Sequence, residues 1–199
     1  MLTVAYDGTG YCGFQMQPGS PTIEGELNRH LSELLREEIR VMGGSRTDTG
    51  VHALCNVAVF DTDSHIPAEK IAYALNSRLP ENIRIQNSRE VPVDFHPRRC
   101  LSRKTYEYRI TRGEFPVPTK RLYSCFTYHE LDVDGMRQAA AYLKGEHDFK
   151  SFCSVKTTAD TTVRTVYELD VEEQGADIVI RVCGSGFLYN MVRIIAGTL

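Results

Sequence analysis

The sequence lacks the features that mark membrane, secreted and disordered proteins. It contains no run of about 18 apolar residues, the length that a membrane-spanning helix needs, and no low-complexity segment. Residues 1–6 lack the basic and apolar regions that open a secretory signal. Apolar and charged residues occur near the proportions of average globular domains. We therefore expect a soluble, cytoplasmic protein with no membrane partner.

The six cysteines are widely separated, and no Cys-x-x-Cys pair occurs among them. Zinc sites and the disulfide frameworks of small secreted domains usually show closely spaced cysteines. We expect reduced thiols, with neither a metal site nor a disulfide framework.

The net charge of −3 argues weakly against a nucleic-acid partner, but the charges are unevenly distributed. Residues 96–121 contain eight lysines and arginines against two glutamates. A nucleic acid needs only one basic face, so this segment is a candidate surface for phosphate groups. The alternative is a solvated hairpin whose outer faces carry charge, and composition alone leaves both open.

At 199 residues the chain can form one large domain or two small ones, each with its own core. Apolar periodicity and capping signals predict strands and helices in both halves. The first half has predicted strands at 2–6, 56–60 and 83–85, with helices at 23–38 and 67–79 between them. The second half has a predicted strand at 103–111, a helix through 136–143 that stops at Gly145, a hairpin of 163–171 with 177–182, and a helix at 187–196. This pattern predicts an α+β fold of two units, 1–93 and 94–199, with their sheets side by side.

Residues 44–53 read Gly-Ser-Arg-Thr-Asp-Thr-Gly-Val-His-Ala and connect two apolar segments. Asp48 stands between two threonines, and Gly50 follows two positions later. Such a run is ordinarily a polar turn, since Asp bonds its own backbone and Gly accepts a positive φ. Arg46 adds a second possibility, because a neighbouring guanidinium lowers the pKa of a carboxylate from its reference value of about 3.9. Asp48 is therefore a candidate nucleophile, ionised at neutral pH.

Arg193 stands between two apolar side chains in the last predicted helix. Burying an unpaired guanidinium costs several kcal/mol, so a buried Arg193 needs a carboxylate partner, for which Asp48 is a candidate. The alternative is a helix face from which the arginine reaches solvent. Tyr106 and Tyr108 form a second polar feature, in the strand predicted at 103–111.

Four blocks of sequence, in this order along the chain, resemble the TruA family of tRNA pseudouridine synthases. They are Tyr-Asp-Gly-Thr-x-Tyr-x-Gly-Phe-Gln at 6–15, Arg-Thr-Asp-x-Gly-Val-His-Ala at 46–53, Asp-Phe-His-x-Arg at 94–98 and Gly-Phe-x-Tyr-Asn-Met-Val-Arg at 186–193. Each block alone is only suggestive, whereas four in order across nearly the whole chain form a strong signal. The resemblance implies a pseudouridine synthase fold: two RRM-like (ferredoxin-like) α+β units with adjoining antiparallel or mixed sheets and an active-site cleft between them.

The resemblance also implies a reaction. The family breaks the N-glycosidic bond of a uridine in tRNA, rotates the base and rejoins it through C5, without metal or cofactor. By resemblance Asp48 is the catalytic nucleophile, and attack at C1′ of the ribose or at C6 of the ring is left open. Tyr106 would stack on the target uracil, and Arg193 would be the basic partner of the aspartate. The implied targets are tRNA positions 38 to 40 in the anticodon arm, and the implied assembly is a homodimer.

Other polar residues are candidates for binding the tRNA. Arg46 and His52 would flank the target nucleotide. Four basic residues are candidates for phosphate contacts, namely Arg98, Arg99, Arg103 and Lys104. Because the family continues past the region of Leu199 into further helix and strand, we expect the C-terminal unit to be truncated.

Two other functions fit parts of the sequence. A non-catalytic RNA-binding module, or an inactive fragment of such an enzyme, would use paired strands with exposed tyrosines and would not depend on Asp48. Asp48-Thr49-Gly50 also resembles the signature of aspartic proteases, in which two carboxylates share a proton. Only one copy is present, and Arg46 would oppose proton sharing by keeping Asp48 ionised.

Overall fold

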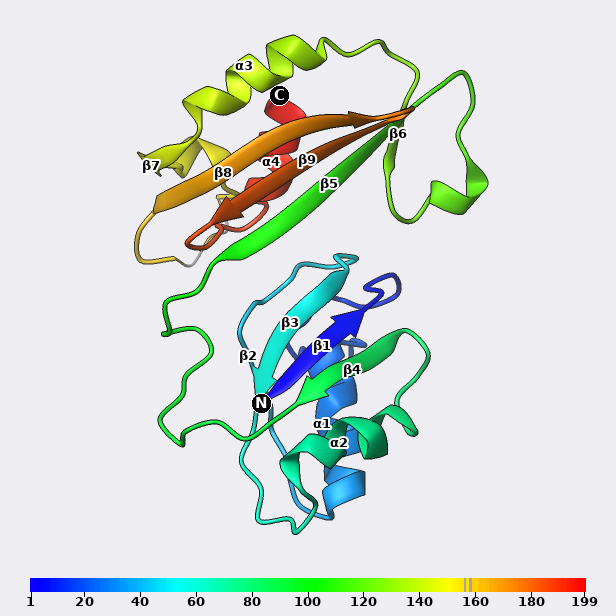
Figure 1. Cartoon of the computed structure of the whole chain (residues 1–199), viewed down its shortest axis with the longest axis vertical. Helices are drawn as coiled ribbons and strands as arrows, with labels where there is room; N and C mark the ends of the chain where they lie inside the picture. The colour runs from blue at the N-terminus through cyan, green and yellow to red at the C-terminus, as the bar shows by residue number, and fades with distance from the viewer. Residues whose placement is uncertain (156, 158) are drawn as a thin grey trace. The chain divides into compact units, whose positions relative to one another are not determined.

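The computed structural model describes residues 1–155, 157 and 159–199. The chain divides into two compact units, Met1–Cys100 and Leu101–Leu199, and each contains one sheet and its own helices (Figure 1). An α+β fold with two sheets is therefore confirmed. The boundary predicted between residues 93 and 94 lies in the segment that leads up to Cys100.

The first unit has the order of elements of a ferredoxin-like domain. Its four strands form one antiparallel sheet in the order β2-β3-β1-β4, and two helices connect them. The elements are β1 (Leu2–Tyr6), α1 (Ile23–Leu35), β2 (Met42–Gly43), β3 (Ala53–Val59), α2 (Ala68–Asn76) and β4 (Ile83–Ser88). Among the described residues of this unit, β2 is the one strand that the sequence pattern did not predict.

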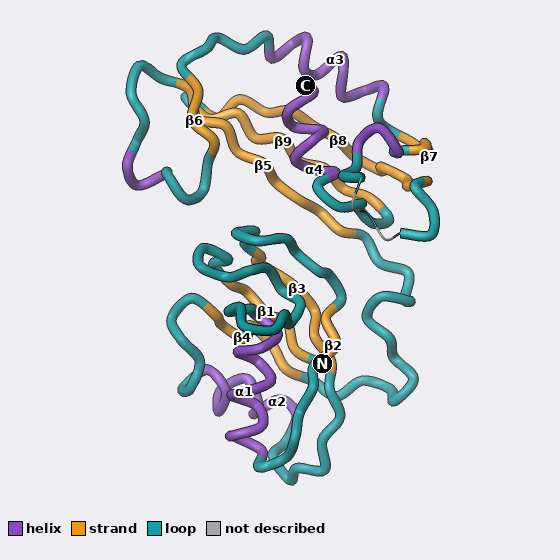
Figure 2. The backbone as a smooth tube through the Cα atoms, turned by 180° about the vertical axis from the view of Figure 1, so that it is seen from behind, coloured by secondary structure: helices purple, strands orange, loops and turns teal. Residues whose placement is uncertain are grey.

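Both helices of the first unit cover the same face of its sheet, as the two opposite views show (Figure 2). The face of α1 that points inward carries Ile23, Leu27 and Leu31, which recur at helical spacing and are fully buried. Alternate residues of β1, Leu2, Val4 and Tyr6, meet them from the sheet. The end of β1 lies beside the start of β3, where Tyr6 pairs with Ala53, so the loop that follows β1 and the loop that precedes β3 leave the sheet together.

Helix α1 begins where the sequence predicts and ends earlier. The Thr22 hydroxyl accepts a hydrogen bond from the Gly25 amide, which makes Thr22 the N-cap. The helix ends at Leu35 rather than near Glu38, because Arg36 adopts a left-handed conformation with φ of 59°. The amide of Ile39 then bonds the Ser32 hydroxyl, which turns the chain toward β2.

The second unit has a five-stranded sheet in the order β6-β5-β9-β8-β7, with β5 and β6 parallel and the other pairs antiparallel. Here the strands β8 and β9 form a hairpin and the last helix follows them, so the order of elements differs from that of the first unit. The elements are β5 (Lys104–Arg112), η1 (Pro118–Lys120), β6 (Cys125–Thr127), α3 (Val133–Tyr142), β7 (Gly145–Asp148), η2 (Lys150–Phe152), β8 (Val163–Gln174), β9 (Asp177–Gly184) and α4 (Met191–Thr198).

The prediction for the last helix was wrong at its start. The helix predicted from residue 187 begins at Met191, because Asn190 adopts a left-handed conformation with φ of 61°. The preceding apolar residues serve the core in a non-helical conformation: the Phe187 ring packs edge-on against Tyr106, and Leu188 is buried. Their apolar character made them resemble the first turn of the helix.

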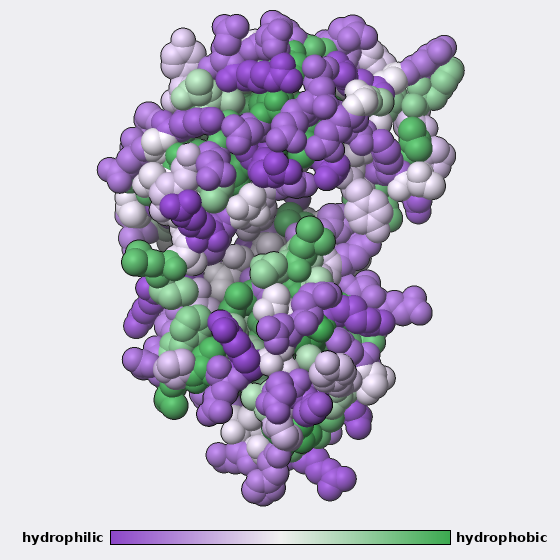
Figure 3. Space-filling model, in the orientation of Figure 1, coloured by the Kyte–Doolittle hydropathy of each residue, from purple (hydrophilic) through white to green (hydrophobic). Residues whose placement is uncertain are grey.

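The face of the second sheet opposite α4 is covered by charge. Arg181 on β9 pairs with Glu107 on β5 and with Glu172 on β8, at 2.8 and 3.4 Å. Arg109 adds a second contact to Glu107 at 3.0 Å. The view onto this face is accordingly mostly hydrophilic over these strands (Figure 3). The aromatic residues Tyr106 and Tyr108 of β5 lie on the other face, against the core.

Candidate active site

Asp48 begins a tight turn in the loop formed by residues 44–52, which connects β2 to β3. The Val51 amide donates to the Asp48 carbonyl oxygen at 3.1 Å, and Gly50 has φ of 75°, which together define a tight turn. Asp48 is partly exposed, and the two residues after it are exposed. Asp48 is therefore the first residue of the turn, and Thr49 and Gly50 form its exposed apex.

The residue before the aspartate is buried and tied to the core. The Thr47 hydroxyl oxygen lies 2.7 Å from the hydroxyl of Tyr6, which lies at the end of β1. The Asn56 side chain donates to the same Tyr6 oxygen at 3.1 Å. Burial raises the pKa of Tyr6, and the hydrogen bonds to Thr47 and Asn56 act in the opposite direction. Tyr6 therefore stays a neutral phenol at physiological pH.

The loop between β1 and α1 packs directly on the backbone of the Asp48 loop. A Cβ atom on Gly13 would lie 2.6 Å from the Thr47 carbonyl oxygen, and one on Gly8 would lie 2.1 Å from that of Val51. The amide of Phe14 donates to the Thr47 carbonyl oxygen at 3.0 Å. The first and second sequence blocks of the resemblance thus form one structure, in which glycine permits backbone to approach backbone.

His52 closes the loop on its other side. Its Nδ1 atom accepts a hydrogen bond from the Gly8 amide at 3.1 Å and lies 3.0 Å from Oδ1 of Asp7. The same Asp7 oxygen accepts from the Thr9 amide at 2.9 Å. His52 is about one-third exposed, so part of its ring stays open to solvent while Nδ1 faces the β1–α1 loop. Arg46, the other predicted neighbour of the target nucleotide, is exposed.

The third sequence block also meets this loop. A Cβ atom on Gly44 would lie 3.4 Å from the carbonyl oxygen of Pro97, which is buried. Arg98 and Arg99 follow directly and are exposed. Within the part of the chain that the structure describes, neither arginine lies within salt-bridge distance of a carboxylate. Arg98 and Arg99, two of the four predicted phosphate-binding residues, therefore lie in the same unit as Asp48. They directly follow Pro97, which contacts the start of the Asp48 loop.

The second unit holds the other predicted residues. Tyr106 in β5 is half-buried, and its ring centroid lies 5.1 Å from that of Phe187 with the planes at 82°. This edge-on contact restricts the orientation of the Tyr106 ring. Arg103 is exposed and lies 4.8 Å over the Tyr167 ring, a cation–π geometry, and Lys104 is partly exposed.

Arg193 lies on α4, where its side chain is exposed. Burial raises the pKa of Tyr108 most, and the neighbouring Cys125 thiol raises it further. The positive charge of Arg193 lowers it. Arg193 thus affects Tyr108 of β5 electrostatically. Its pairing with Asp48 stays a proposal.

Sequence reasoning did not predict the parts played by Tyr6 and Asn56. The sequence indicated Tyr6 as an alternating residue of β1 and as the first residue of the 6–15 block, and Asn56 only as the start of a strand. One signal was available, since Asn56 is an amide in a strand of otherwise apolar or small residues. A buried amide needs hydrogen-bond partners.

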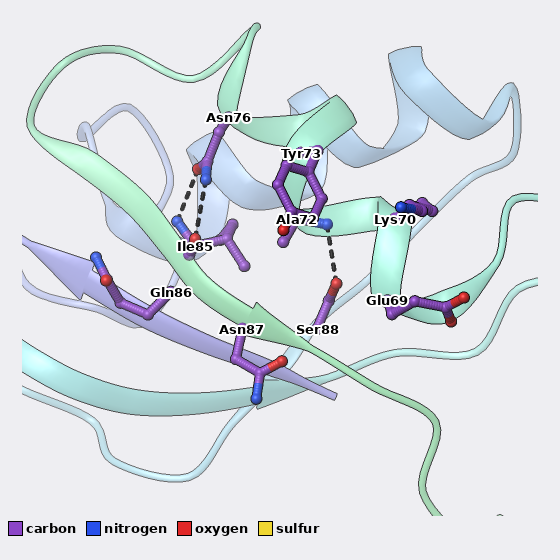
Figure 4. A pocket seen from close by; sticks show the side chains of 9 residues that line it. All are labelled: Glu69, Lys70, Ala72, Tyr73, Asn76, Ile85, Gln86, Asn87 and Ser88. Atoms are coloured by element: carbon purple, nitrogen blue, oxygen red, sulfur yellow. Dashed lines mark hydrogen bonds between the residues drawn. The ribbon is translucent and has the colours of Figure 1, made fainter.

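A separate polar cavity of about 330 Å³ lies between α2 and β4 in the first unit (Figure 4). Asn76 occupies one side of it and makes two hydrogen bonds of 2.8 Å with the Ile85 backbone, which caps the outer edge of β4. The cavity contains none of the predicted site residues. Its lining residues are Glu69, Lys70, Ala72, Tyr73, Asn76, Ile85, Gln86, Asn87 and Ser88.

The described residues contain neither a helix that could span a membrane nor a cluster of side chains that could hold a metal ion. No helix in that part of the chain is both long and apolar enough to span a membrane. The same residues contain no group of three or more His, Cys, Asp or Glu side chains that could hold a metal ion.

Comparison with known proteins adds information beyond the geometry. A family model described as tRNA pseudouridine synthase matches residues 2–98 and 139–199. Proteins named tRNA pseudouridine synthase A are similar over almost the whole chain. The one from Brevibacillus brevis is 47% identical over 196 residues, which cover 98% of this chain and 80% of that protein. Those from a Thermoanaerobacter species and Ruminiclostridium cellulolyticum are 45% and 47% identical over 199 residues, covering all of this chain and 82% and 81% of theirs.

The family model covers some of the predicted site residues and leaves others outside. Asp48, His52 and Arg193 lie within the matched segments, whereas Tyr106 and Arg103 lie between them.

Proposed function

The chain belongs to the tRNA pseudouridine synthase family, and on that premise we propose that it isomerises uridine to pseudouridine in tRNA. The observation that carries the proposal is the Asp48 loop, in which a partly exposed aspartate begins a tight turn and the residue before it is buried and hydrogen-bonded. A fixed nucleophile beside open solvent suits a reaction on a large substrate. Because the substrate is tRNA, we further propose that the protein acts in the cytoplasm.

We propose Asp48 as the nucleophile, attacking either C1′ of the ribose or C6 of the uracil ring. The bond from N1 to C1′ breaks, the uracil rotates, a bond from C5 to C1′ forms, and the bond that Asp48 made breaks again to restore the carboxylate. C5 loses its proton and N1 gains one, so the product is an isomer of the substrate. The target base must leave its stack first, at a cost of a few kcal/mol.

Residues outside the loop would assist this reaction. We propose Tyr106 as the aromatic side chain that stacks on the target uracil, which is worth about 1–3 kcal/mol per base. The edge-on packing of its ring on Phe187 supports this role, because a ring with restricted orientation loses little entropy on stacking. Tyr106 or a water molecule would accept the C5 proton. Arg193 is proposed as the basic partner of the aspartate, and Arg46 and His52 as neighbours of the target nucleotide.

Binding of the tRNA would depend on basic side chains. We propose phosphate contacts for Arg98, Arg99, Arg103 and Lys104, of which the first three are exposed. Each contact would release bound counterions and make affinity fall with salt. Positions 38 to 40 of the anticodon arm and a homodimeric assembly are proposed from the family resemblance, and sedimentation in solution would test the assembly.

Tritium release from tRNA labelled at uridine C5 tests the proposed reaction. The wild-type chain is expected to release tritium, and Asp48→Ala to release none while still binding tRNA. The affinity for tRNA, measured at several salt concentrations, tests the proposed phosphate contacts. Replacing one of the basic side chains should make the affinity depend less steeply on salt.

A different outcome would support the competing function. If neither protein releases tritium while both bind tRNA equally, the chain is a non-catalytic RNA-binding module or an inactive fragment of such an enzyme, and the proposed reaction of this chain is excluded.

A further inference from the structure

Asn56 is only 4% exposed, and its side chain makes as many hydrogen bonds as an amide allows. Its Oδ1 atom accepts from the amides of Ser45 and Val57, at 3.1 and 2.9 Å. Its Nδ2 atom donates to the Ser45 carbonyl oxygen and to the Tyr6 hydroxyl, at 3.0 and 3.1 Å. An amide offers two donors and two acceptor positions, so this one is saturated. Both polar groups of the Ser45 backbone are therefore held by a single side chain.

These contacts fix the orientation of the Asn56 amide, which is connected to Thr47 through the Tyr6 hydroxyl. Backbone amides can only donate, and the Ser45 carbonyl can only accept, so the orientation of the Asn56 amide is fixed. Its Nδ2 atom must then donate to the Tyr6 oxygen. The Tyr6 hydroxyl also forms a hydrogen bond with the Thr47 hydroxyl, 2.7 Å away, in which either oxygen can be the donor. The chain of bonds runs from Asn56 through Tyr6 to Thr47.

The two ends of this chain fix the loop on either side of Arg46. Asn56 holds Ser45, and Tyr6 holds Thr47, whose neighbour is Asp48. We infer that Tyr6 and Asn56 are positioning residues for the catalytic carboxylate, an inference that rests on the proposed function of Asp48. Neither residue touches the substrate in this account. They act by holding Thr47 in place, and small displacements of a reacting group lower rates steeply.

If Tyr6 positions the carboxylate, its substitution should lower kcat by more than a control substitution that lowers the melting temperature does. Tyr6→Phe keeps the buried ring and removes only the hydroxyl, so Thr47 and Asn56 each lose a hydrogen-bond partner. We expect kcat to fall about ten- to a hundredfold with KM changed less than about twofold, because tRNA contacts stay while the nucleophile is displaced. Thr47→Val removes the same bond from its other end, and the double variant should be no slower than the slower single variant.

Ser88→Ala provides a matched control in the same unit. Ser88 is 3% exposed, and its hydroxyl accepts a hydrogen bond from the Ala72 amide at 2.9 Å, away from the Asp48 loop. This variant loses one buried hydrogen bond and Tyr6→Phe loses two, so its melting temperature should also fall, but by no more than that of Tyr6→Phe. Its kcat is expected to equal that of the wild type.

Hydrogen exchange tests the inference independently of activity. The backbone amides of residues 44–52 should exchange faster in Tyr6→Phe than in the wild type. In Ser88→Ala their exchange rates should equal those of the wild type. Equal exchange in all three proteins would overturn the inference, even if the wild type were inactive. Equal loss of kcat in Tyr6→Phe and Ser88→Ala would also overturn it. Absence of activity in the wild type, with faster exchange in Tyr6→Phe, would instead reject the proposed function and leave the positioning intact.

Discussion

At the scale of single residues, the site depends on where side chains are missing as much as on where they are present. Gly13 brings the β1–α1 loop against the backbone of Thr47, and its φ of 89° lies in the region that disfavours other residues. Gly10 has a similar φ of 94°, but a Cβ atom there would meet nothing within 4 Å. A side chain at Gly10 would therefore introduce backbone strain alone, whereas one at Gly13 would introduce strain and also a clash with the catalytic loop.

Substitution of these glycines should distinguish the two effects. Gly10→Ala is expected to cost about 1–2 kcal/mol of stability through strain alone, with kcat unchanged. Gly13→Ala should cost more, and its kcat should fall at least about tenfold, because the new methyl group must displace the Thr47 carbonyl. Urea denaturation and single-turnover kinetics measure both. Equal kcat in the two variants would contradict the account of the loop contact.

At the scale of elements, one carboxylate ties together three parts of the second unit. Asp177 at the start of β9 accepts from Lys120 of η1 through both of its oxygens at 2.7 Å. Its Oδ1 atom also accepts from Thr111 of β5 at 2.7 Å. The hydrogen bond from Lys120, and next that from Thr111, hold the pKa of Asp177 below its usual value. This contact anchors the segment between β5 and β6.

The lowered pKa predicts how stability depends on pH. A carboxyl group whose pKa is lower in the folded state stabilises the protein above its unfolded pKa, near 3.8. That contribution is lost as the pH falls through the lower folded value. Asp177→Asn should therefore melt below the wild type at pH 7, and the difference should shrink below pH 3.8. Asp134→Asn is the control, since its side chain is 83% exposed and its ion pair with Arg137 should contribute little.

A difference that stays constant from neutral to acid pH would contradict this reading of Asp177. Fluorescence-detected melting at pH 7 and near pH 3 is sufficient for the comparison.

At the scale of the whole molecule, periodicity predicted most of the fold because each unit has its own apolar core. The inward residues of α1 and β1 recur at periods that the sequence displays directly. The strands β6 and β7 were missed, since β6 has three residues and β7 consists of Gly-Glu-His-Asp, without apolar alternation. The buried hydrogen bonds of Asn56 were missed for a different reason. One of its partners, Tyr6, is 50 positions away, and such pairing depends on the fold rather than on local pattern.

Detection of the product is the most direct test of the central claim, that this chain makes pseudouridine in tRNA through Asp48. Unmodified tRNA with uridines at positions 38 to 40 would be incubated with the wild type or with Asp48→Ala, then treated with a carbodiimide that marks pseudouridine and copied by reverse transcriptase. We predict stops at the marked uridines among positions 38 to 40 for the wild type and none for Asp48→Ala. Equal stops with both proteins, or none with the wild type, would contradict the account.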